Sequence, residues 1–247
     1  MCIYNFGHDR RWQTLYHATL EHFTTGRRFD RTARRAIEKN DGAIPDTQLL
    51  RDIAKEYKVI RGIPRADRDN DQAAECFRTA LNKAAQNWQG DLVDKARKCL
   101  ALASQASEQG WTHRRLISAM TKYMWFLRPQ GWTVYDSFAR RGLCIYDDDP
   151  DTAVVQFYQK LQDRGFLEAA DAISATLPNQ EMNWLFGERV IDKYLMIAGG
   201  AVESGLIPPV QEILDKLDAE TAATADAIAQ AVATEHCDKA FFLPPQD

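Results

Sequence analysis

Cysteine is scarce in this sequence, and its spacing excludes the usual cysteine-based sites. The 247 residues include five cysteines, none of them in a C-x-x-C pair, so we expect neither a zinc ribbon nor a disulfide framework. No stretch approaches the roughly 20 apolar residues of a membrane span, and residues 1–12 lack the apolar core of a secretory signal. These absences predict a reduced, cytoplasmic protein with no membrane partner.

Signals of β-structure and of sequence repeats are also missing. No Val- or Ile-rich run alternates with polar residues as a half-buried strand does, and no repeat of roughly 20–50 residues is visible. Gly199 and Gly200 are not followed by Lys-Ser or Lys-Thr, which excludes a phosphate-binding loop there. Apolar residues recur at helical spacing instead, over residues 11–25, 46–57, 71–88, 90–108, 114–127, 152–164, 166–176 and 182–205.

These helical patterns predict an all-α, multi-helix globular fold. The hydrophobic content of 45% is ample for a packed core. We expect either one domain over residues 1–247, or two helical lobes, about 1–110 and 111–247, with a cleft between them. Gly26 is expected to stop the first helix. The segment 182–205 is apolar over much of its circumference, which is typical of a central packing helix.

Charge is unevenly distributed along the chain. The formal net charge is −4, but residues 1–150 hold 25 Lys and Arg against 19 Asp and Glu, whereas residues 151–247 hold 6 against 16. Such asymmetry predicts a basic face and a separate acidic region. Five arginines fall on one helix face, namely Arg27, Arg28, Arg31, Arg34 and Arg35. Two interpretations of this face stay open: a solvated face paired with Asp30 and Glu38, or contact with nucleic-acid phosphates.

Groups that could hold a metal ion have simpler explanations. His17 and His22 are five residues apart, a poor separation for one metal on a helix, and further ligands are missing. Four carboxylates surround Pro150, namely Asp147, Asp148, Asp149 and Asp151. They could bind a divalent cation, but they also precede a helix, whose N-terminal end favours negative charge. We favour the second explanation and expect no metal site.

Residues 114–140 have the pattern of a helix, a loop that follows a proline, and the start of a second helix. At about 100° per residue, the apolar face of the first helix holds Leu116, Met120, Tyr123, Met124 and Leu127. The opposite face holds Arg114, Ser118, Thr121, Lys122 and Trp125. Pro129 ends this helix, and Asp136 is placed to cap the next one. Lys122 and Asp136 are therefore expected to face one cleft.

This segment resembles the catalytic segment of 8-oxoguanine DNA glycosylase-like proteins, which belong to the helix-hairpin-helix DNA glycosylase superfamily. The shared pattern is Thr-Lys, an apolar helix, and then an apolar residue, Tyr and Asp-Ser, here Thr121-Lys122 and Val134-Tyr135-Asp136-Ser137. The resemblance implies that Lys122 supplies a nucleophilic amine and that Asp136 stabilises charge and assists proton transfer. The Leu-Pro-Gly-x-Gly hairpin of the family is absent before the lysine, so an atypical hairpin is expected.

The chemistry implied by this resemblance is removal of a base from DNA. A neutral lysine amine can attack the sugar carbon that carries the base, and Trp125 could keep water from that amine. The base must leave the stack and enter a pocket. The residues expected to contact it are Trp111, Ser118, Trp125, Trp132 and Tyr135. DNA contacts are expected from the basic face together with Arg114, Arg128 and Arg140.

The predicted function is thus a DNA glycosylase that excises a damaged base, or a modified base of foreign DNA, with or without strand cleavage afterwards. The expected partner is DNA, no cofactor is expected, and the protein is expected to be a monomer. The alternative is a helical protein without an active site that binds nucleic acid or another protein. A cleft that holds Lys122 and Asp136 beneath a basic rim would favour the glycosylase.

Overall fold

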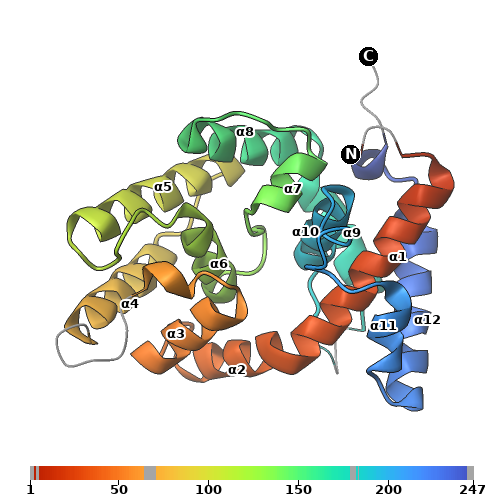
Figure 1. Cartoon of the computed structure of the whole chain (residues 1–247), viewed down its shortest axis with the longest axis horizontal. Helices are drawn as coiled ribbons and strands as arrows, with labels where there is room; N and C mark the ends of the chain where they lie inside the picture. The colour runs from red at the N-terminus through yellow and green to blue at the C-terminus, as the bar shows by residue number, and fades with distance from the viewer. Residues whose placement is uncertain (1–2, 4–5, 64–70, 179–181, 183, 244–247) are drawn as a thin grey trace. The chain divides into compact units, whose positions relative to one another are not determined.

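The computed structural model describes residues 3, 6–63, 71–178, 182 and 184–243 (Figure 1). These residues form helices and turns, with no strand among them, so the predicted all-α fold is confirmed. The α-helices are α1 (His8–Thr25), α2 (Arg31–Lys39), α3 (Thr47–Glu56), α4 (Asp71–Gln86), α5 (Leu92–Glu108), α6 (Ile117–Leu127), α7 (Ser137–Gly142), α8 (Pro150–Asp163), α9 (Phe166–Thr176), α10 (Gly187–Ala198), α11 (Val210–Asp215) and α12 (Ala219–His236).

The chain divides into two compact units. One consists of Met1–Arg28 and Tyr135–Asp247, and the other of Phe29–Val134. We call them the terminal unit and the inserted unit. The sequence suggested a division near residue 110, whereas the structure assigns α1 to the same unit as the C-terminal helices.

The terminal unit is built around α10, which packs against α1, α7 and α9. Glycines allow these helices to approach closely. A Cβ atom at Gly199 would lie 1.9 Å from the carbonyl oxygen of Phe138, and one at Gly142 would lie 2.3 Å from that of Leu195. The helix is shorter than the expected segment 182–205, because the chain leaves it at Gly199 and turns at Gly200, where φ is +93°.

The inserted unit is built around α6, which packs against α2, α4 and α5. Every residue of α6 from Ala119 to Leu127 is buried. Tyr123 anchors the helix, since its hydroxyl donates to the carbonyl of Leu50 at 2.9 Å and its ring meets Phe77 edge-on. Because the neighbouring helices cover this part of α6 on all sides, none of its faces is exposed to water. The predicted polar face of α6 is therefore wrong.

Gly26 does not stop the first helix. Its φ and ψ of −63° and −44° are helical, and the chain passes from α1 through a π-helical turn, Gly26–Asp30, into α2. Glycine is needed there for packing, because a Cβ atom would lie 2.6 Å from the ring of Trp184. A π turn holds more residues than an α turn, so arginines on either side of it lose the α-helical spacing of the sequence prediction.

Helix caps match the sequence more closely. The Asp149 carboxylate accepts a hydrogen bond from the Thr152 amide at 2.8 Å and caps α8, as the interpretation of that acidic stretch proposed. Gly165 lies at φ +72° between α8 and α9, where the sequence separated two helices. No helix in the described ranges combines the length and apolarity that crossing a bilayer requires.

The cysteines differ from expectation. Cys144 is disulfide-bonded, whereas Cys76, Cys99 and Cys237 are free thiols. The expectation of no disulfide is therefore wrong, because disulfide pairing depends on distance in space rather than on spacing in the sequence.

Candidate functional site

Lys122 lies in the middle of α6 and is buried, with 7% of its surface exposed. Its Nζ donates a hydrogen bond to the Ser118 hydroxyl oxygen at 2.6 Å. Residues four apart share one face of a helix, so α6 itself sets this pairing. The structure thus brings the predicted nucleophile to a residue predicted to contact substrate. It also shows that Lys122 is not the exposed lysine that its helix position suggested.

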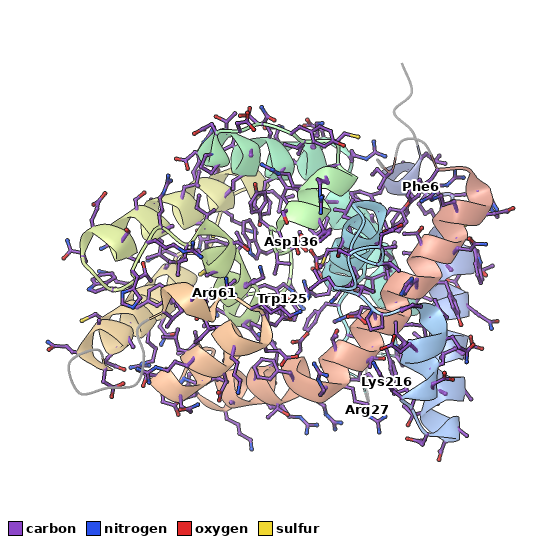
Figure 2. All side chains as sticks on the ribbon, in the orientation of Figure 1. Phe6, Arg27, Arg61, Trp125, Asp136 and Lys216 are labelled. Atoms are coloured by element: carbon purple, nitrogen blue, oxygen red, sulfur yellow. The ribbon has the colours of Figure 1, made fainter. Side chains whose placement is uncertain are left out.

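Asp136 caps α7, as the sequence predicted. Its Oδ1 accepts hydrogen bonds from the amides of Phe138 at 2.8 Å and Ala139 at 2.9 Å. Figure 2 labels Asp136 at the start of this helix. The two amide donors at the N-terminal end of the helix fix the orientation of the carboxylate. Helix α7 is itself held by its close packing on α10.

The two predicted catalytic residues belong to different units. Lys122 is part of the inserted unit and Asp136 part of the terminal unit. The segment that carries the family resemblance therefore crosses the boundary between Val134 and Tyr135. The expectation that both side chains face one cleft stays a prediction.

Within the inserted unit, the tryptophans predicted to receive a base have different surroundings. Trp125, labelled in Figure 2, and Trp132 have no exposed surface. The indole Nε1 of Trp132 donates to the Thr121 carbonyl at 3.1 Å, so this ring belongs to the core. Tyr135 packs edge-on against Phe157 in the terminal unit, with ring centroids 5.3 Å apart.

Trp111 lines an open groove of about 570 Å³ that does not include Lys122. The groove runs along α4 and α5, and its lining includes Cys76, Leu102 and Trp111 but none of the predicted catalytic residues. The sequence grouped four aromatic residues because they are close along the chain. Trp125 and Trp132 are core residues, whereas Trp111 borders open space. Their packing in the fold, and not their position in the sequence, makes this difference.

Two of the predicted DNA-binding arginines donate hydrogen bonds to carbonyl groups at the C-terminal end of α6. Arg34 donates to the Phe126 carbonyl at 2.7 Å, and Arg128 donates to the carbonyls of Leu127 at 2.6 Å and Gly42 at 3.2 Å. The last carbonyls of a helix lack helical partners and attract cations. Burial lowers the pKa of Arg34 from its usual value, and the neighbouring charge of Arg128 adds to this. Both residues are better explained as structural.

The other predicted arginines differ in their surroundings. Arg27 donates to the Thr221 hydroxyl at 3.1 Å, and Arg140 donates to the Asp147 carbonyl at 3.0 Å. Arg35 and Arg114 are exposed. Arg28 is exposed and Arg31 is half-buried. The π turn interrupts the α-helical spacing from which the basic face was predicted, and the unit boundary falls within the same stretch. A single face made by Arg27, Arg28, Arg31, Arg34 and Arg35 therefore stays a prediction.

Sequence reasoning missed a cluster of buried charged and polar residues between α1 and α10. Its members are Glu21, His22, Glu188, Arg189, Asp192 and Lys193, each less than 9% exposed. The Nζ of Lys193 lies 3.2 Å from Glu21 Oε1, and Arg189 pairs with Asp192. The available signal was four charged residues at i, i+1, i+4 and i+5 within an otherwise apolar helix.

His22 is the neutral member of this cluster. Its Nε2 accepts a hydrogen bond from the Phe186 amide at 3.1 Å. Burial, with smaller contributions from Arg189 and Lys193, holds the pKa of His22 well below its usual value of 6.5. Neutral His22 and the ion pairs join α1 to α10, since a buried charge is tolerated only with a partner.

Comparisons of the chain with protein-family models, with curated proteins and with solved structures found no match. The family resemblance therefore rests on residues 114–140 alone.

Proposed function

We propose that the protein is a DNA glycosylase, with Lys122 as its nucleophile and Asp136 as its charge stabiliser. The observation that carries the proposal is the burial of the Lys122 amine in α6, where the Ser118 hydroxyl holds it at 2.6 Å. Lysine is almost never buried unless it is paired or has a chemical task. The Ser118 hydroxyl is a neutral partner for the amine, and an amine held in this way is able to react once it loses its proton.

In the proposed reaction, the neutral Nζ of Lys122 attacks C1′ of an extruded nucleotide. The bond from C1′ to the base breaks, and the base leaves with the bonding electrons and takes up a proton. One amine proton goes to the departing base; the C1′–O4′ bond then breaks and O4′ takes up the second amine proton, which opens the sugar ring and gives an imine between Lys122 and C1′. The Asp136 carboxylate, oriented by the two amides of α7, stabilises the positive character of the sugar during bond cleavage. Ser118 positions the amine.

DNA contact is proposed for the exposed arginines rather than for the whole predicted set. Arg35 and Arg114 are exposed, and guanidinium groups pair well with phosphate oxygens. Arg34 and Arg128 are committed to the carbonyls at the end of α6, so their proposed role is structural.

The alternative function is that of a helical protein that binds nucleic acid or another protein without catalysis. Two observations favour it. The Asp136 contacts are ordinary helix-cap contacts, and two of the four predicted base-binding aromatic residues are core residues without exposed surface.

Release of a free base separates the two functions. The protein is incubated with duplexes that carry a panel of modified bases, and mass spectrometry detects the released base. We expect release from at least one duplex, and loss of release in Lys122→Met and Asp136→Asn.

Each variant has a matched control. Lys95→Met removes another partly buried lysine of the inserted unit, whose Nζ donates to the Gly131 carbonyl at 3.0 Å. Asp149→Asn alters another helix cap. Both controls should keep base release. Absence of release from every duplex, or equal release by Lys122→Met and the wild type, supports the alternative.

A further inference from the structure

Three potential metal ligands from opposite ends of the chain converge in the terminal unit. His8 begins α1, whereas Cys237 and Asp238 follow α12. The His8 Nε2 lies 3.7 Å from Cys237 Sγ and 3.3 Å from Asp238 Oδ2. One ligand atom from each residue lies within 4.8 Å of the other two. His8 lies more than 200 positions before Cys237 and Asp238 in the sequence, so only the fold brings it to them.

The two separations from His8 Nε2 are close to those between ligands of a tetrahedral metal ion. Zinc binds imidazole nitrogen and carboxylate oxygen at about 2.0–2.2 Å and thiolate sulfur at about 2.3 Å. Ligand atoms at neighbouring corners of such a tetrahedron are then about 3.3–3.6 Å apart. The distances from His8 Nε2 to its two neighbours are 3.3 and 3.7 Å, so a metal ion could bind with little rearrangement.

Cys237, His8 and Asp238 do not have the arrangement of a catalytic Cys-His-Asp triad. In a triad, the thiol and the carboxylate contact opposite nitrogens of the imidazole ring. Here Cys237 and Asp238 both approach Nε2 of His8. Convergence of three ligand atoms on one point is the geometry of chelation.

Neighbouring side chains hold the ligands in place. The His8 Nδ1 lies 3.2 Å from Asp9 Oδ1. If Nδ1 donates its proton to Asp9, the Nε2 lone pair is left to face Cys237 and Asp238, which is the tautomer that a metal needs. Metal-binding histidines are commonly oriented by a carboxylate in this way.

Arg11 orients the other two ligands, Cys237 and Asp238. It is buried, with 8% exposed, and its Nη2 lies 2.5 Å from Asp238 Oδ1 while its Nε donates to the Cys237 carbonyl at 2.9 Å. The Nη1 of Arg11 donates to the Phe6 carbonyl at 2.9 Å. Because Arg11 occupies Oδ1, the oxygen that faces His8 is Oδ2. Such supporting contacts are typical of metal centres.

We propose that His8, Cys237 and Asp238 bind a divalent metal ion of the zinc class, with the fourth position open to solvent. The set of one nitrogen, one sulfur and one oxygen ligand suits zinc better than magnesium or calcium, which take oxygen ligands. The His8 and Asp238 side chains are 56% and 60% exposed, so solvent reaches the open position. The bound ion links the start of α1 to the segment after α12. The site is independent of the proposed glycosylase function.

Cobalt(II) titration of the metal-free full-length chain tests this proposal. A cobalt–thiolate bond gives a charge-transfer band in the near-ultraviolet, and tetrahedral coordination gives intense visible bands. We expect one equivalent of cobalt to produce both, and one equivalent of zinc to displace it. Cys237→Ser should lose the charge-transfer band, and His8→Gln should bind cobalt at least about tenfold more weakly, a loss at the level of a metal-site mutation. Cys76→Ser, which changes a free thiol outside the site, should keep the wild-type spectrum.

A second measurement keeps the test valid if a variant folds poorly. His8 is an exposed residue at the first position of α1, so His8→Gln should keep the helical circular dichroism of the wild type. Zinc should raise the melting temperature of the wild type but not that of His8→Gln. The proposal is overturned if the wild type shows no thiolate band, if Cys237→Ser keeps the band, or if zinc stabilises both proteins equally. Each of these results would mean that His8 contacts Asp9 and Asp238 without binding a metal ion.

Discussion

At the scale of single residues, the burial of Lys122 changes the expected effect of its substitution. An exposed lysine would cost less than about 0.5 kcal/mol on replacement by alanine. Because Lys122 is buried and bonded to Ser118, we expect Lys122→Ala to lower the free energy of unfolding by about 1–3 kcal/mol. Lys122→Met keeps the aliphatic stem and should cost less. Urea unfolding of both variants measures this, and an unchanged midpoint for Lys122→Ala would contradict the buried environment.

Asp136 should behave in stability measurements like any helix-capping carboxylate. We expect Asp136→Ala to cost about 1 kcal/mol of unfolding free energy and Asp136→Asn close to none, because asparagine also caps well. Asp149→Ala, at the cap of α8, should cost a similar amount. Chemical denaturation compares the three variants. A loss for Asp136→Asn as large as that for Asp136→Ala would mean that the charge, and not the cap, stabilises the fold.

The lowered pKa of His22 predicts how the stability of the fold depends on pH. Its pKa is lower in the folded protein than in the unfolded chain, so the unfolded chain binds more protons below about pH 6.5. Stability should therefore fall as the pH decreases from about 7 to 5. His17 and His236 act in the same direction, since burial lowers their pKa values too.

The contribution of His22 to this dependence can be isolated. It is at most about 1.4 kcal/mol per pH unit. His22→Gln should flatten the dependence between pH 7 and 5, whereas His113→Gln, at an exposed position, should not. Guanidinium unfolding at several pH values measures the slope. An identical slope for His22→Gln and wild type would rule out a proton-linked role for His22.

At the scale of elements, the packing of α7 on α10 depends on two glycines. The Cβ atom of an alanine at residue 199 or 142 would meet a backbone carbonyl at 1.9 or 2.3 Å. Since a backbone carbonyl cannot move aside as a side chain can, we expect Gly199→Ala and Gly142→Ala each to cost about 1–3 kcal/mol. Gly7→Ala is the control, because nothing lies within 4 Å of a Cβ atom there. Thermal unfolding compares them, and equal melting temperatures would refute the close approach.

The elements that depend on local sequence were predictable. Helices α4, α5 and α9 lie within about two residues of their expected bounds, and the caps at Asp136 and Asp149 are formed. Each depends on helical periodicity or on one side chain bonded to an amide two or three residues away. Local sequence carries that information in full.

Features that depend on distant packing were not predictable. The burial of Lys122 depends on the helices around α6, and the need for glycine at residue 26 depends on Trp184, which is 158 positions away in the sequence. The structural use of Arg34 depends on the position of the Phe126 carbonyl. A sequence pattern shows that such a residue is basic or small, but its neighbours in space decide what it does.

At the scale of the whole molecule, the division into two units also lay beyond sequence reasoning. Helix α1 packs against α10 and α12, so the first 28 residues join a unit whose remainder begins at Tyr135. No shift in composition marks these boundaries in the sequence. The Lys122 and Asp136 segment was recognised by its residue pattern, whereas the placement of the two residues in different units came only from contacts.

DNA binding is the next property at this scale. If the proposed function is right, duplex DNA binds and its affinity falls with salt, with a slope of about −0.9 in log K against log salt for each phosphate contact. Arg35→Gln and Arg114→Gln should weaken binding and make the slope shallower by about 0.9 each. Arg97→Gln, an exposed arginine near Asp94, is the control. Fluorescence anisotropy measures the slope, and a slope near zero would leave the protein-interaction alternative as the better account.

The central claim is that Lys122 forms a covalent intermediate with DNA, and borohydride trapping tests it most directly. The protein is mixed with a duplex from which it releases a base, and borohydride reduces any imine to a stable protein–DNA adduct. We predict an adduct with the wild type and with the exposed-lysine control Lys55→Met, with DNA-linked mass on the peptide that contains Lys122, and no adduct with Lys122→Met. An adduct of equal yield in Lys122→Met, or base release by the wild type without any adduct, would contradict the assignment of Lys122 as the nucleophile.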